Sequence, residues 1–103
     1  MRMTRKAPSE VQTMPELRAQ IDALDRDLIA LLAERQRHID RAAQLKPALG
    51  WPARIDERVE DVVSKVEATA AELGFDPALA GALWRQMIDE AIAREERLMA
   101  GRG

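Results

Sequence analysis

The sequence predicts an all-α protein with three helices per chain, one of them very long. Apolar residues recur at spacings of three and four over most of the chain, which is the spacing of one helix face. The helix breakers proline and glycine gather at two places, residues 47 to 54 and residues 74 to 77, and no stretch alternates as a strand does. With 103 residues, 47% of them hydrophobic and 33% charged, the chain has the size of one domain and not the composition of a disordered segment.

The start of the chain differs from the rest. Residues 1 to 13 are polar, lack helical periodicity and contain Pro8, so we expect a mobile N-terminal tail there. The helical domain is expected at residues 14 to 100.

The first helix is expected at residues 15 to 46. Thr13 and Glu16 have the spacing of a capping box, and Pro15 suits the first turn of a helix. Because no breaker follows before the loop at residues 47 to 54, this helix would be about 48 Å long.

The second helix is expected at residues 55 to 73 and the third at residues 77 to 99. Gly74 is well placed to end the second helix in a left-handed conformation. Asp76 and Pro77 form a cap and first-turn pair that begins the third.

The first helix carries a longer apolar stripe than two shorter helices can cover. The stripe includes Leu17, Ile21, Leu24, Leu28 and Leu31. It is either left exposed at a frayed end or covered by a second copy of the chain, and a long half-covered apolar stripe is typical of an interface. We therefore expect an intertwined homodimeric helical bundle.

Composition argues against several classes of function. A net charge of −2 lacks the excess of lysine and arginine that nucleic-acid binding needs. The chain has no cysteine and one histidine, so we expect no metal site. No apolar run reaches the roughly 20 residues of a membrane span, and the first residues do not form a signal peptide. We expect a cytoplasmic protein.

Three charged residues stand where the helical pattern expects apolar ones. Arg35 and Lys46 interrupt the apolar face of the first helix, and Glu95 interrupts that of the third. A buried charge needs a counter-charge, a hydrogen-bond network or a ligand, because its desolvation costs several kcal/mol. A structural salt bridge or side chains that extend to water would satisfy this need. Two cations against one carboxylate leave positive charge over, which favours a site for an anionic small molecule.

Two further arginines are candidates for the same site. Arg18 lies 17 residues before Arg35, which is about 25 Å along the helix. One small molecule cannot span that distance, so Arg18 is either a solvated arginine or serves the site of a partner subunit. Arg58 is a weaker candidate, because the start of a helix disfavours a cation unless Asp56 and Glu57 compensate.

The run LRAQIDALDRDLIALLAER at residues 17 to 35, with Lys46, Arg58 and Glu95, resembles the all-helical class of chorismate mutases. The resemblance covers about residues 14 to 99. It implies an intertwined dimer of the shikimate pathway, which serves aromatic amino acid biosynthesis. Each of its two pockets, shared between subunits, would convert chorismate to prephenate. This pericyclic reaction needs no nucleophile, metal or cofactor.

The resemblance also implies a role for each charged residue. Arg18 of the partner and Arg35 would hold the substrate carboxylates, because arginine pairs with carboxylates through two bonds. Lys46 and Glu95 would bind the ether oxygen of the bond that breaks, and Arg58 would add positive potential. The implied substrate-binding set is Arg18, Arg35, Lys46, Arg58, Val59, Ala91 and Glu95.

Three positions depart from the family pattern. Val59 stands where many members have an acidic residue for the ring hydroxyl, Ile55 replaces a polar residue, and Ala91 replaces a serine or threonine of some members. An arginine followed by valine also occurs in the related isochorismate pyruvate lyases, which make salicylate and pyruvate. That lyase reaction is the enzymatic alternative, and a helical dimer module without catalysis is the third.

Glu95 makes the expected activity dependent on pH. A glutamate donates a hydrogen bond to the ether oxygen only when it is protonated. Turnover of the parent protein is therefore expected to rise from about pH 8 to about pH 5, and Glu95→Gln is expected to weaken that dependence. The measurement is kcat/KM across this range, and a flat parental profile would contradict the role of Glu95.

Overall fold

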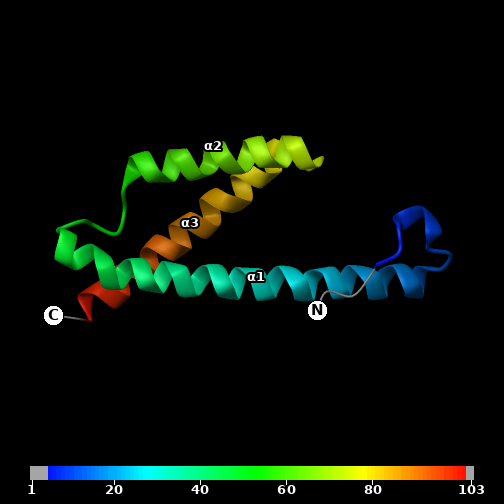
Figure 1. Cartoon of the computed structure of the whole chain (residues 1–103), viewed down its shortest axis with the longest axis horizontal. Coiled ribbons are helices and arrows are strands. Elements are labelled where there is room, and N and C mark those ends of the chain that lie inside the picture. Colours follow the sequence, from blue (N-terminus) through cyan, green and yellow to red (C-terminus); the bar gives the residue numbers. More distant parts are fainter. Residues whose placement is uncertain (1–4, 102–103) are drawn as a thin grey trace. The chain divides into compact units, whose positions relative to one another are not determined.

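The computed structural model describes residues 5 to 101, and within these residues it is all-helical without strands. A short 3-10 helix, η1 (Pro8–Glu10), precedes α1 (Met14–Leu49), α2 (Asp56–Leu73) and α3 (Pro77–Ala100) (Figure 1). This confirms the predicted fold class for the described residues. The chain divides into two compact units, Met1–Arg35 and Gln36–Gly103, and α1 contributes residues to both.

The first unit contains a short N-terminal segment that is hydrogen-bonded to α1. Arg5 pairs with Asp27 at 2.7 Å. The backbone N–H of Lys6 donates to Gln20 Oε1 at 2.8 Å, and Gln20 Nε2 donates back to the carbonyl of Lys6 at 3.3 Å. The mobile tail stays a prediction, and its first four residues lie outside the described part of the chain.

The start of α1 follows the sequence pattern. Thr13 Oγ1 accepts a hydrogen bond from the backbone N–H of Glu16 at 3.3 Å, which satisfies one of the free donors of the first turn. The predicted cap is therefore confirmed.

The predicted end of α1 at residue 46 was wrong, because the helix continues through Pro47 to Leu49. Pro47 has no N–H for a bond to the carbonyl four residues earlier, and the helix ends two residues after it. Gly50 ends the helix instead. It has φ +70°, its N–H bonds to the carbonyl of Pro47 at 3.1 Å, and Trp51 N–H bonds to the carbonyl of Lys46 at 3.1 Å.

The connection between α2 and α3 matches the sequence prediction. Gly74 adopts φ +82° and ends α2. Asp76 caps α3, since its carboxylate accepts from the backbone N–H groups of Ala78 at 2.9 Å and Leu79 at 3.3 Å.

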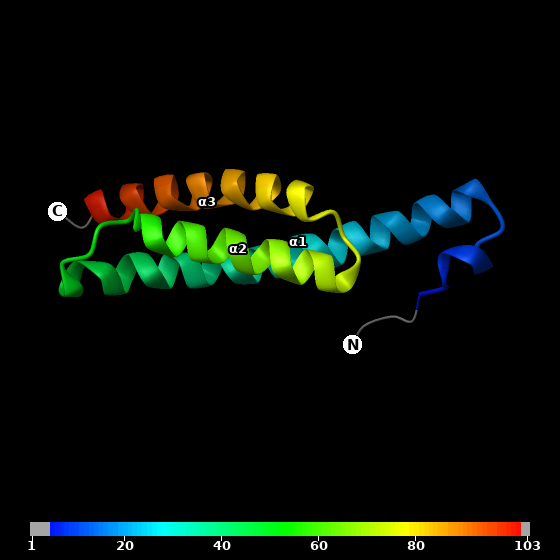
Figure 2. The same cartoon turned by 90° about the horizontal axis from the view of Figure 1, so that it is seen from above.

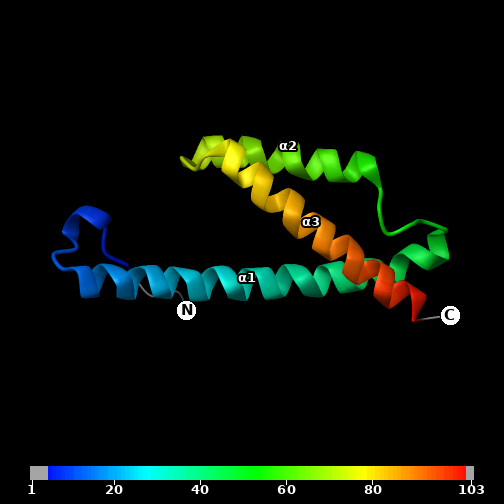
Figure 3. The ribbon, with the colours of Figure 1, turned by 180° about the vertical axis from the view of Figure 1, so that it is seen from behind.

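The core of the second unit lies between α2, α3 and the loop before α2. These two helices lie side by side (Figure 2). Buried apolar side chains form the cluster Ala53, Val63, Ile88 and Ile92, against which Val59, Val62, Trp84 and Met99 pack. α3 begins near the C-terminal end of α2 and runs toward the C-terminal end of α1 (Figure 3). Among the described residues α1 contributes one buried residue, Ala43.

The apolar stripe of α1 is exposed in the single chain. Ile21 is 47% exposed, Leu28 56% and Leu31 55%. The homodimer stays a prediction. Within residues 5 to 101, no helix has the length and apolar character to cross a membrane.

Candidate functional site

Two of the three unexpected charges meet in the interior of the second unit. Lys46 Nζ on α1 lies 2.7 Å from Glu95 Oε1 on α3, and the two side chains are only 15% and 5% exposed. Lys46 is in the last turn of α1, where the helix dipole favours a cation. The structural salt bridge that the sequence left open is therefore present, and it places an ammonium beside a buried carboxylate.

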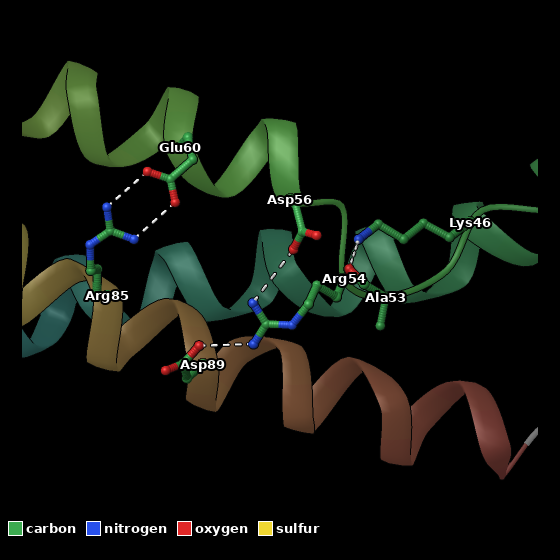
Figure 4. A network of polar contacts seen from close by, with 7 residues as sticks. All are labelled: Lys46, Ala53, Arg54, Asp56, Glu60, Arg85 and Asp89. Atoms are coloured by element: carbon green, nitrogen blue, oxygen red, sulfur yellow. Dashed lines mark hydrogen bonds and ion pairs between the residues drawn. The ribbon is translucent and has the colours of Figure 1, made fainter.

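The loop before α2 supplies a second partner for Lys46. The ammonium donates to the backbone carbonyl of Ala53 at 2.7 Å (Figure 4). Ala53 is itself buried, and the next residue, Arg54, pairs with Asp89 on α3 at 2.9 Å. An ammonium has three donors and Ala53 accepts one of them, so Lys46 keeps donors for a ligand beside its ion pair with Glu95. Sequence reasoning missed this carbonyl, since any residue type supplies one.

The carboxyl group of Glu95 retains hydrogen-bonding capacity. Its Oε1 is buried and forms the ion pair with Lys46 Nζ, but it has no hydrogen-bond partner among the described residues. A buried polar atom without a partner carries a cost of roughly 1 to 3 kcal/mol. The ion pair with Lys46 offsets that cost, and the carboxyl can still form a hydrogen bond with a ligand.

Arg58 is engaged elsewhere on α2. Its guanidinium donates to Asp61 at 2.7 Å, and its side chain is 64% exposed. Asp61 also accepts from Lys65 at 3.0 Å, and the hydrogen bonds from Lys65 and Arg58 hold the pKa of Asp61 below its ordinary value. Asp61 thus balances the charge of Arg58. No ion pair joins Arg58 to Glu95 among the described residues.

The apolar positions of the expected site are partly buried. Val59 packs against the core cluster of α2 and α3. Ala91 on α3 and Ile55, which precedes α2, are also partly buried. No hydroxyl or carboxylate stands at these three positions for a polar ligand group.

Arg18 and Arg35 belong to the first unit. Arg18 is exposed and Arg35 is partly buried. Neither side chain makes an ion pair with another described residue in the single chain. Their places in a binding site stay predictions.

A second ion pair between α1 and α3 was not foreseen from the sequence. Arg94 binds Asp40 through two bonds, Nε to Oδ1 at 2.6 Å and Nη2 to Oδ2 at 3.0 Å. The hydrogen bond from Arg94 lowers the pKa of Asp40, and the same bond raises the pKa of Arg94. Both residues lie outside the apolar stripes, so periodicity contains no signal for their pairing.

The family model for chorismate mutase type II matches residues 17–96. The chain belongs to the chorismate mutase type II family. All seven residues of the predicted substrate-binding set lie within the matched range, and the resemblance seen in the sequence is confirmed.

Curated relatives of this chorismate mutase type II chain are T-proteins. The T-protein of Enterobacter agglomerans is 29% identical over 85 residues, which are 82% of this chain and 23% of that protein. The T-protein of Haemophilus influenzae is 28% identical over 89 residues, which are 86% of this chain and 24% of that protein. The chain thus spans about a quarter of the length of these relatives.

Removing the cation of the buried pair is expected to destabilise the protein. Lys46→Met leaves the carboxylate of Glu95 buried without a counter-charge, so the free energy of unfolding should fall by about 3 kcal/mol. The double variant Lys46→Met/Glu95→Leu removes both charges and should return to within about 1 kcal/mol of the parent. Urea denaturation at neutral pH measures both.

The matched control is Lys65→Met, which breaks the exposed pair with Asp61. Exposed pairs contribute little, so this variant should unfold as the parent does. Equal losses in Lys46→Met and Lys65→Met would contradict a special cost of the buried pair.

Proposed function

We propose that the chain is a chorismate mutase that rearranges chorismate to prephenate. The observation that carries the proposal is the buried Lys46–Glu95 pair in a chain of the chorismate mutase type II family. The reaction is a pericyclic rearrangement in which the ether bond of chorismate breaks as a carbon–carbon bond forms. Because the bond changes take place within the substrate, the proposal assigns no nucleophile, metal or cofactor.

Lys46 and Glu95 stabilise the charge that develops on the ether oxygen. A further N–H of Lys46, beside the one that Ala53 accepts, donates to this oxygen, and Glu95 donates a second hydrogen bond in its protonated form. Donors held in a buried site act strongly, since removal of one such donor from an enzyme costs about 10²- to 10³-fold in kcat. Both groups are already held in place by α1, α3 and the loop.

The substrate carboxylates bind to arginines from two subunits. Arg35 of one subunit and Arg18 of the other hold them, and Arg58 adds positive potential. The exposed apolar stripe of α1 supports the second subunit, because it is the face that an antiparallel copy would cover. Held by its two carboxylates, the substrate keeps the compact conformer in which the reacting atoms meet.

The alternative substrate is isochorismate, with cleavage to salicylate and pyruvate. Val59 favours this alternative, since an apolar side chain follows Arg58 and packs on the core where a ring hydroxyl would need a polar partner. A helical dimer without catalysis is the non-enzymatic alternative, and the buried pair with its incomplete hydrogen bonding argues against it.

A paired assay distinguishes these functions. The parent protein should consume chorismate, followed as the loss of its absorbance, and should release little salicylate from isochorismate, followed by fluorescence. Arg35→Ala and Lys46→Ala should each lower kcat/KM by about 10²-fold or more. Parental turnover in both variants would exclude the proposed site, salicylate release above chorismate turnover would favour the lyase, and turnover of neither substrate would favour the helical module.

Mixing of inactive subunits tests the shared pocket. Arg18→Ala and Lys46→Ala homodimers should each be nearly inactive. In a mixed dimer one pocket receives both substitutions and the other receives neither, so about half of the parental activity per dimer should return. Subunits are exchanged under mild denaturant and assayed after refolding, and the lack of any recovery in a confirmed heterodimer would contradict a shared pocket.

A further inference from the structure

The attachment of α1 to α3 depends on polar contacts more than on apolar packing. The buried cluster of the second unit comes from α2, α3 and the loop at Ala53. Of the described residues of α1, Ala43 alone is buried, and it offers a single methyl group. A single buried methyl group makes few contacts, so it defines the register of the two helices only weakly.

Two ion pairs join α1 to α3, and their charges are arranged in opposite order. α1 supplies the anion of the Asp40–Arg94 pair, whereas it supplies the cation of the Lys46–Glu95 pair. Arg94 and Glu95 are adjacent in α3. A slide that moved Glu95 toward Asp40 would bring two carboxylates together, and one that moved Arg94 toward Lys46 would bring two cations together. The crossed charges therefore favour one register.

The Asp40–Arg94 pair has the geometry that fixes orientation. Two parallel bonds of 2.6 Å and 3.0 Å join the guanidinium fork to the carboxylate. Such a fork constrains both distance and direction, whereas the ammonium of Lys46 acts as a point charge. The side chain of Arg94 is 38% exposed and that of Asp40 32%, and the hydrogen bond from Arg94 lowers the pKa of Asp40, which favours its charged form.

We propose that Asp40 and Arg94 are positioning residues of the mutase site, which hold α3 in register so that the Glu95 carboxyl meets Lys46 and the breaking ether oxygen. This inference rests on the proposed function. Neither residue touches the substrate. Their effect reaches the reaction through the placement of the adjacent Glu95.

The chain offers a matched control in a second forked pair. Arg85 on α3 binds Glu60 on α2 through bonds of 2.9 Å and 2.8 Å (Figure 4). The hydrogen bond from Arg85 lowers the pKa of Glu60, as Arg94 does for Asp40. This pair joins two helices that already share the apolar core. Variants that remove this pair therefore show how the loss of a two-bond arginine–carboxylate pair affects the protein when neither residue is adjacent to Lys46 or Glu95 in the sequence.

The experiment compares two sets of variants of the full chain. All variants are assayed with chorismate. The Asp40 set consists of Asp40→Asn, Arg94→Gln and the double variant of the two. The Glu60 set consists of Glu60→Gln, Arg85→Gln and the double variant of the two. The Asp40 set should lose roughly tenfold in kcat with KM within about twofold, because misplacement of Glu95 weakens the transition state more than the ground state. The double variant should be no worse than the singles. The Glu60 set should keep parental kcat, and Asp40→Glu, which retains the carboxylate, should recover part of the loss.

A second experiment measures protein unfolding instead of turnover, so it tests the inference independently of the proposed function. The coupling between Lys46 and Glu95 is obtained from the unfolding of the parent, Lys46→Met, Glu95→Leu and their double variant, and again in the Asp40→Asn background. If Asp40 positions Glu95, the coupling energy between Lys46 and Glu95 should fall by about half or more in the Asp40→Asn background. In the Glu60→Gln background it should stay unchanged. An unchanged coupling, or equal kcat losses in the two sets, would overturn the inference. A parent without turnover but with the predicted fall in coupling would overturn the proposed function alone.

Discussion

A lysine and a glutamate that meet at 2.7 Å in the interior determine how this protein is organised around its site. Lys46 comes from the last turn of α1 and Glu95 from the buried face of α3, so the pair joins elements far apart in the sequence. A buried ion pair adds little stability over two apolar side chains of the same size, although breaking it is costly. Stability alone therefore does not account for the pair, which agrees with the ligand-binding role proposed for it.

The rest of the second unit is a support for that pair. The core of α2 and α3 keeps Glu95 away from water, and the loop turns the carbonyl of Ala53 toward Lys46. α1 adds almost no apolar burial of its own to this unit, which gives weight to its polar contacts with α3. The same helix leaves Ile21, Leu28 and Leu31 exposed in the single chain. A second subunit would cover this stripe and bring the arginine that the proposed pocket needs.

Two separate observations support the proposed mutase reaction. They are membership of the chorismate mutase type II family and the geometry of the Lys46–Glu95 pair. The family match extends over residues 17–96 and so includes every residue of the expected site. The structure adds three features of the expected site: an ammonium that keeps donors, a buried carboxyl with incomplete hydrogen bonding, and partly buried apolar side chains at Val59 and Ala91. That last feature is the reason why isochorismate stands beside chorismate as a substrate to be tested.

The sequence by itself determined the helices, their caps at Thr13, Gly74 and Asp76, and the charges at positions 46 and 95, because these depend on local spacing and on helical periodicity. It did not determine that Pro47 lies within α1, since the helix end depends on Gly50 and the bonds around it. Only the tertiary structure decided that Lys46 binds the carbonyl of Ala53, that Arg58 turns to Asp61, and that Asp40 binds Arg94. These contacts depend on where side chains and a backbone oxygen meet in space, and residue type and spacing do not encode that meeting.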